Sequence, residues 1–98
     1  MAHAILQYKK ADAQKVEAIL ADDVVSRQSI VLRDGDALGK DKEHKFMLIE
    51  GSEAALKRAE ELATAAGGSV VKEGAEALYN TIKSQDEDAA SGMGMIFG

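Results

Sequence analysis

The apolar pattern is clearest over residues 45–67. Residues 46–49 (Phe-Met-Leu-Ile) are apolar without interruption, which predicts a strand covered on both faces rather than a half-exposed one. Ser52 can cap a following helix, because its hydroxyl can accept a hydrogen bond from an amide of the first turn. The apolar residues that follow have helical spacing: Leu56, Ala59, Leu62, Ala63 and Ala66. Gly67 can take the left-handed conformation that ends a helix, so the stretch predicts a strand, a turn and a helix.

Further patterns on both sides of this stretch predict three more strands and two more helices. The strands are expected at residues 4–8, 24–33 (strongest at 29–33) and 69–72. The helices are expected at residues 13–21, with Asp12 as the N-cap, and at 75–85. A polar connection with two glycines, residues 34–43, joins the second and third strands. We expect this connection to be more mobile than the strands it joins.

The order strand, helix, strand, strand, helix, strand, followed by a third helix, predicts an α+β fold. It corresponds to the split βαβ pattern of the ferredoxin-like sandwich. We therefore expect a sheet in the order 4-1-3-2, with the first and third strands central, adjacent and parallel. The division expected along the chain is a single domain at residues 1–85 and an acidic, Gly- and Met-containing tail at 86–98.

Both faces of this expected sheet are apolar. In the first strand Leu6 and Tyr8 point to one face and Ile5 to the other, and the second strand likewise sets Leu32 against Val31. Two helices can cover only one face. We therefore expect the other face to be covered by the third helix, by the tail or by a second subunit, which makes a homodimer one expectation.

Composition excludes several classes of function but does not identify one. The chain has 98 residues, a net charge of −5 and no cysteine. Its acidity argues against general binding to nucleic acid or to anionic membranes. The lack of cysteine excludes disulfides, thiolate metal sites and a cysteine nucleophile. The sequence shows neither an apolar run of transmembrane length nor a signal-peptide pattern, so the expected location is the cytoplasm.

Two groups of residues are candidate metal ligands. His3 and His44 fall near the starts of the first and third strands, which are expected to be neighbours, and with Asp41 or Glu43 they could bind zinc or nickel. The alternative is that both are solvated strand ends. The second group could hold calcium, or could simply form a solvated hairpin tip; it consists of Asp34, Asp36, Asp41 and Glu43.

Other candidate chemistry is limited. Lys9 and Lys10, with Asp12, precede a predicted helix and could hold a phosphate or carboxylate, although no glycine-rich loop accompanies them and ordinary exposed lysines are the alternative. Tyr8 and Phe46 occupy the strands where RNA-recognition domains place stacking aromatics, but core positions are the favoured interpretation. No nucleophile elbow is present, so a catalytic serine triad is not expected, and no cofactor is indicated.

The tail combines acidic residues 86–88 with glycine-spaced apolar residues, namely Met93, Met95, Ile96 and Phe97. It resembles the C-terminus of archaeal ribosomal stalk proteins. In that family the tail engages translation factors, so the resemblance implies a docking peptide for a protein partner. The alternative is that these residues fold back onto the sheet.

The order of elements also resembles the layout of ACT-like regulatory domains, which implies a regulatory, ligand-binding role. The sequence alone does not identify an activity, and fold analogy cannot choose one. The leading hypothesis is a non-catalytic interaction or small-ligand-binding module that self-associates. One alternative is a small enzyme or metal-binding protein with a site between subunits, built from His3, His44, Lys9 or the Asp34/Asp36 connection. Another is an adaptor that docks through its tail.

Overall fold

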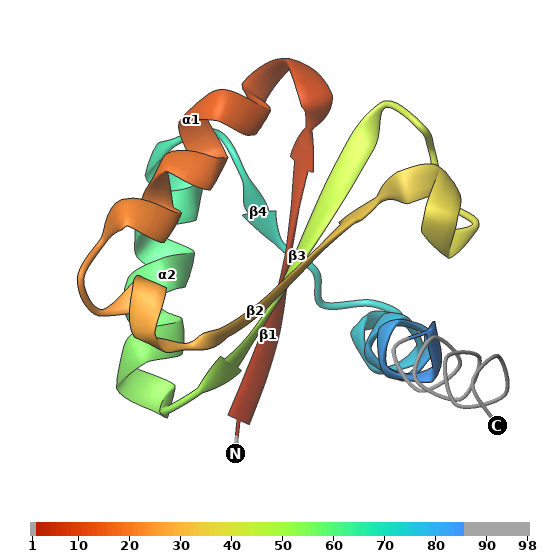
Figure 1. The fold of residues 1–98 in the computed structure, drawn as a ribbon. Coiled ribbons are helices and arrows are strands. Elements are labelled where there is room, and N and C mark those ends of the chain that lie inside the picture. The colour runs from red at the N-terminus through yellow and green to blue at the C-terminus, as the bar shows by residue number, and fades with distance from the viewer. Residues whose placement is uncertain (1, 86–98) are drawn as a thin grey trace, which may run out of the picture.

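A computed structural model describes residues 2–85 and has an α+β architecture around a four-stranded antiparallel sheet (Figure 1). The sheet order is β2-β3-β1-β4, which is the predicted 4-1-3-2 read from the other edge. The strands are β1 Ala2–Lys9, β2 Ser29–Asp34, β3 His44–Gly51 and β4 Ser69–Val70. The helical segments are η1 Lys10–Asp12, α1 Ala13–Glu17, η2 Ala18–Ala21, η3 Val25–Arg27, η4 Gly35–Leu38, α2 Glu53–Ala65, and a C-terminal helix at residues 75–85.

The two central strands run in opposite directions, so the prediction that they are parallel was wrong. β1 pairs with β3 from Ala2 opposite Gly51 to Lys9 opposite His44. The reason lies in the connections. The helical crossover from β1 returns the chain to the same end of the sheet, which makes β2 parallel to β1. The hairpin connection then reverses β3, and β3 lies between the two and is antiparallel to both.

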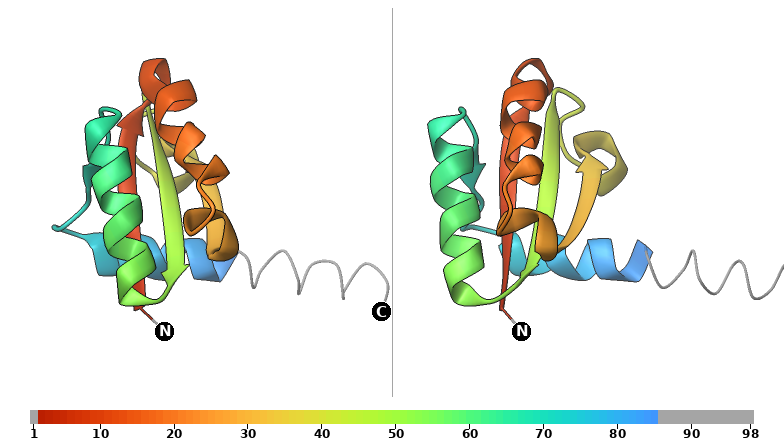
Figure 2. Two further views of the ribbon diagram at one scale, coloured as in Figure 1. Left: turned by 90° about the vertical axis from the view of Figure 1, so that its left-hand side faces the viewer. Right: turned by 60° about the vertical axis from the view of Figure 1, so that its left-hand side comes forward.

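The helix-bearing face is packed by α1 and α2, which lie on one side of the sheet (Figure 2). The predicted start of α2 is confirmed, since the Ser52 hydroxyl accepts a hydrogen bond from the Ala55 amide at 3.2 Å. Its predicted end is confirmed too, because Gly67 has a φ of 107°. Leu56 and Ala59 of the apolar stripe are buried against Met47 and other side chains of this face.

The second face of the sheet is covered by the C-terminal helix, which lies on the side opposite α1 and α2 (Figure 1). Leu78 and Ile82 from this helix form one buried cluster with Ile5, Phe46 and Leu48 from the sheet. Of the three covers expected from the sequence, the structure therefore supplies the third helix. Residues 46–49 of β3 are at most 3% exposed, which confirms a strand buried on both faces.

Two local predictions in the first half of the chain were wrong. Asp12 makes no side-chain cap for α1, because residues 10–12 already form a 3-10 turn and Asp12 has φ −100° and ψ 2° rather than the extended backbone that a cap requires. Residues 24–28 are not strand. The Asp22 carboxylate accepts hydrogen bonds from the amides of Val24 and Val25, both at 3.1 Å, which folds the chain into a turn and η3 before β2 begins.

The connection between β2 and β3 has more buried structure than its polar sequence suggests. It begins with η4, in which Gly35 and Leu38 are both buried. The side-chain amide of Gln85, on the C-terminal helix, donates a hydrogen bond to the Ala37 carbonyl at 2.8 Å. Gly35 thus packs in the interior although it belongs to this polar connection, and the expected mobility of the connection stays a prediction.

Candidate functional site

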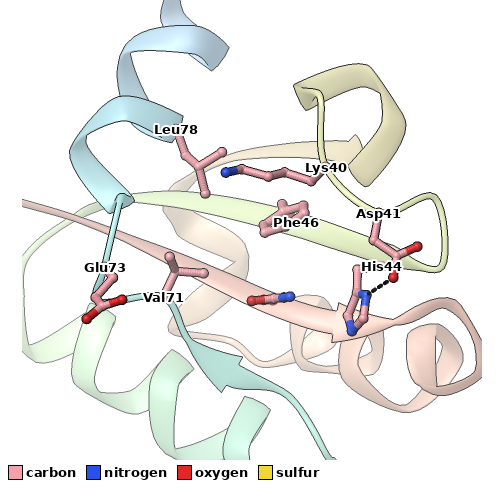
Figure 3. A pocket seen from close by; sticks show the side chains of 8 residues that line it. Lys40, Asp41, His44, Phe46, Val71, Glu73 and Leu78 are labelled. Carbon is pink, nitrogen blue, oxygen red and sulfur yellow. Dashed lines mark ion pairs between the residues drawn. The ribbon is translucent and has the colours of Figure 1, made fainter.

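The second face of the sheet contains a cavity of about 410 Å³ beside the first turns of the C-terminal helix (Figure 3). Its apolar lining comes from Phe46, Val71 and Leu78. Five polar side chains from β1, the β2–β3 connection, the first residue of β3 and the segment after β4 complete it, namely Gln7, Lys40, Asp41, His44 and Glu73. An apolar floor with a few converging polar groups is the usual composition of a small-molecule site.

Gly35 fixes the position of the loop that supplies Lys40, Asp41 and His44. A Cβ atom on Gly35 would lie 1.9 Å from the Asp41 carbonyl oxygen and 2.8 Å from that of His44. Only glycine therefore permits this approach of the two backbones. The Lys40 amide donates a hydrogen bond to the Gly35 carbonyl at 2.8 Å, and so η4 holds the cavity wall in place.

Asp41 and His44 form a pair at one end of the cavity. Nδ1 of His44 lies 3.4 Å from Oδ2 of Asp41, as Figure 3 shows. The Glu43 amide donates a hydrogen bond to Oδ1 of Asp41 at 2.8 Å. That bond lowers the pKa of Asp41, burial opposes it, and the neighbouring His44 adds to the lowering. Nδ1 of His44 is buried and has no well-aligned hydrogen bond within the described residues, so the pair is close but incompletely bonded.

Three further polar groups of the cavity lack partners. Within residues 2–85, the side chains of Gln7, Lys40 and Glu73 make neither an ion pair nor a hydrogen bond to another residue. Lys40 extends from its loop alongside Phe46 toward Leu78, whereas Glu73 lies on the other side of the cavity from His44 (Figure 3). The cavity thus presents an amide, an ammonium group and a carboxylate to which no other side chain within residues 2–85 is bonded.

The opposite end of the second face contains the other histidine. The rings of His3 and Tyr79 are stacked with centroids 4.0 Å apart. The Tyr79 hydroxyl donates a hydrogen bond to Glu50 at 3.1 Å, and the Lys83 ammonium group pairs with the same carboxylate. The hydrogen bond from Lys83 lowers the pKa of Glu50; burial opposes this and Tyr79 reinforces it. These contacts fasten the C-terminal helix to the ends of β1 and β3.

The structure does not bring His3 and His44 together. His3 lies opposite Glu50, whereas His44 lies opposite Lys9, six residues further along β1, which corresponds to roughly 20 Å. The expectation that they are close was wrong, because it depended on the first and third strands being parallel. Asp34 ends β2 and Asp36 lies in η4. No group of three or more histidine or carboxylate side chains suited to a metal ion occurs within residues 2–85.

The lysines considered for anion binding do not sit at the start of a long helix, since α1 spans only Ala13–Glu17. The Lys10 amide donates a hydrogen bond to the Glu43 carbonyl at 2.9 Å. Lys9 borders a second cavity of about 190 Å³ that it shares with His44. The Asp12 carboxylate lies beside Gly67, 3.6 Å from the point that a Cβ atom on that glycine would occupy. The predicted partner-binding residues Met93, Met95, Ile96 and Phe97 lie outside the described residues.

The two aromatic residues weighed for RNA stacking are core residues, as the sequence favoured, with Tyr8 2% and Phe46 3% exposed. Tyr8 belongs to a polar network on the helix-bearing face. Its hydroxyl donates a hydrogen bond to Glu17 at 2.7 Å, and the Lys45 ammonium group lies 2.7 Å from the same oxygen. Burial, followed by the hydrogen bond to Glu17, raises the pKa of Tyr8 far above its ordinary value, so the hydroxyl stays protonated.

From the sequence, either Asp41 or Glu43 was expected beside His44, as a ligand of a candidate metal site, and the rest of the cavity was missed. Gln7 gave the only local signal, as a polar residue inside the apolar run of the first strand. No family model, curated protein or solved structure matches this chain. None of the helices within residues 2–85 is long and apolar enough to cross a membrane.

Proposed function

We propose that this chain is a small-ligand-binding module with a ferredoxin-like layout, and that its site is the cavity on the second face. The observation that carries the proposal is a set of three polar side chains, Gln7, Lys40 and Glu73, that lie around an apolar floor and have no partner within residues 2–85. A cavity of about 410 Å³ falls within the range of roughly 300–1,000 Å³ in which small-molecule sites lie.

The lining defines the kind of ligand. Phe46, Val71 and Leu78 suit a compact apolar body such as a ring or a branched chain. Lys40 can donate to an acceptor on the ligand, Glu73 can accept from a donor, and Gln7 can do either. We also propose that a bound ligand brings His44 into a well-aligned hydrogen bond with Asp41, whose Oδ2 lies 3.4 Å from Nδ1 of His44.

The experiment is an NMR titration of ¹⁵N-labelled protein with aromatic fragments, each carrying a carboxylate, an amide or an amine. We expect shifts of the Gly35, Lys40 and His44 amides. Val71→Trp should abolish them, because the indole fills the cavity. Val70→Trp is the matched control, since Val70 is the neighbouring residue and lines a hollow beside α2 instead.

Two results would contradict the proposal. In one, no fragment shifts the cavity amides at millimolar concentration. In the other, Val71→Trp and Val70→Trp bind the fragments equally well. A comparison of Lys40→Gln with Lys42→Gln then tests the charge, because Lys42 is exposed and does not line the cavity. Only Lys40→Gln should weaken the carboxylate fragments.

A further inference from the structure

The sheet has one long edge along which residues 2–85 place no further strand. β2 and β4 are the two edge strands; β2 has six residues and β4 has two. An unpaired edge of this length is a template for another strand. Proteins usually protect such an edge with lysine, proline or charged residues that point inward. Residues 29–32 (Ser-Ile-Val-Leu) contain none of these. Charge is confined to the end of the strand, at Arg33 and Asp34, where the Arg33 guanidinium donates a hydrogen bond to the Leu32 carbonyl at 2.9 Å.

This edge is also apolar. Within the described part of the chain, the large hydrophobic side chains that remain exposed are Val24, at 40%, and Leu32, at 37%. Leu32 lies on the edge strand opposite Met47, which places it on the helix-bearing face. Ile30 and Val31 are half-buried and lie on opposite faces, because side chains alternate along a strand.

We propose that β2 pairs with β2 of a second copy of this chain, antiparallel about a two-fold axis at Val31. Such an axis, perpendicular to the sheet, sets residues of the same face opposite each other. Val31 then meets Val31 of the second copy, and Ile30 meets Leu32. At the ends of the strand Ser29 meets Arg33, and Gln28 meets Asp34. Apolar residues thus oppose apolar ones and polar residues oppose polar ones, which is the arrangement that stabilises neighbouring strands.

The neighbouring registers lack this match. An axis at Leu32 would set Ile30 opposite Asp34 and Val31 opposite Arg33. An axis at Ile30 would set Leu32 opposite Gln28, and Arg33 and Asp34 would extend beyond the partner strand into its η3. The sequence of the edge therefore selects the register centred on Val31.

The pairing has a consequence for a hollow of about 380 Å³ at the end of β2, whose lining includes Leu32, Asp34 and Lys45. In this register Ile30 and Gln28 of the second copy lie opposite Leu32 and Asp34, so the second copy borders the hollow. The cavity proposed for ligand binding has no lining residue from β2. The pairing is therefore independent of the proposed function: if the pairing does not occur, the proposal of ligand binding still stands.

Cysteine cross-linking tests the register, because the chain contains no cysteine of its own. Directly opposed residues of an antiparallel pair have Cα atoms about 4.5–5.5 Å apart, which a disulfide spans. Val31→Cys should therefore form a covalent dimer under mild oxidation. Ser29→Cys should not, since its counterpart lies roughly 13 Å along the strand, but a mixture of Ser29→Cys and Arg33→Cys should cross-link. Equal linking by Val31→Cys and Ser29→Cys would overturn the register.

Sedimentation of the unmodified protein tests the association itself. We expect its mass to double as the concentration rises from micromolar to millimolar. Leu32→Lys should abolish the change, because it places a charge in the pairing edge. Val24→Lys is the matched control, as Val24 is equally exposed but precedes the strand, and it should still dimerise. A monomer at every concentration, with circular dichroism showing a folded chain, would overturn the proposal.

Discussion

Replacing Ile82 with alanine tests whether the C-terminal helix is an integral layer of the fold. Ile82 is 0% exposed and packs in the cluster of the second face with Phe46 and Leu48. The substitution removes three buried carbon groups, which are worth about 0.8 kcal/mol each, or about 2.4 kcal/mol together. Incomplete closure of the resulting cavity adds to this loss, which should stay within the range of roughly 2–5 kcal/mol that such core substitutions cost.

Urea denaturation of the wild type and the variant measures this loss. A domain of this size has a total stability of roughly 5–15 kcal/mol, so the midpoint should fall by a large fraction. The melting temperature should fall by roughly 10 °C or more, at about 4–8 °C per kcal/mol. Thr81→Ala is the control on the same helix. Thr81 is exposed, and a surface change of this kind should alter the unfolding free energy by no more than about 0.5 kcal/mol.

A loosely attached C-terminal helix would give a different result. If the helix were only loosely attached, Ile82→Ala would release the helix and leave the sheet folded. Hydrogen exchange would then show lost protection over residues 75–85 alone, with the slowest amides of β3 unchanged. That outcome, or a loss below about 0.5 kcal/mol, would refute the inference that the second face is a core.

Two further changes test local interactions. Burial raises the pKa of Glu17, but hydrogen bonds from Lys45 and Tyr8 outweigh it and set the pKa below its ordinary 4.5; the stabilisation is therefore present above that pH and lost as the pH falls through the lowered pKa. In urea denaturation Glu17→Gln should thus be less stable than the wild type near neutral pH. If the difference in unfolding free energy between the two proteins were equally large at about pH 3, the stabilisation could not come from the Glu17 carboxylate. Gly35→Ala should lower the unfolding free energy by about 1–3 kcal/mol, because the added methyl group overpacks against the Asp41 carbonyl. It should also abolish fragment binding. Unchanged chemical shifts of the His44 and Asp41 amides would show that Gly35 does not position this loop.

The elements predicted best from the sequence are those in which local signals agree. In the stretch containing β3 and α2, an uninterrupted apolar run, a capping serine and a terminal glycine all indicate the same boundaries. The first helix and the second strand were less accurate, because Asp12 and Asp22 can each bond the backbone in more than one way. Asp22 makes its turn while also pairing with Arg58 of α2, through contacts of 2.6 and 2.8 Å. That contact joins residues far apart in the chain, so no local pattern could predict it.

The cavity could not be predicted for a related reason. Gln7, Lys40 and Glu73 belong to three segments, and only the folded chain brings them together. Lys40 and Glu73 are exposed, and in a sequence they look like any other surface charges. The position of Lys40 depends on Gly35, whose role appears only when the backbone of residues 41–44 lies against it.

Strand direction decides which histidine lies at the proposed ligand site. Because β1 and β3 are antiparallel, His3 and His44 lie at opposite ends of the second face. At the His3 end, Tyr79 and Lys83 of the C-terminal helix use the ring and the Glu50 carboxylate for helix attachment. At the other end the helix contributes Leu78 to a cavity wall, and there Gln7, Lys40 and Glu73 have no partner among the described residues. The C-terminal helix is thus attached to the second face at one end, which leaves the other end available for the proposed ligand site on the same sheet.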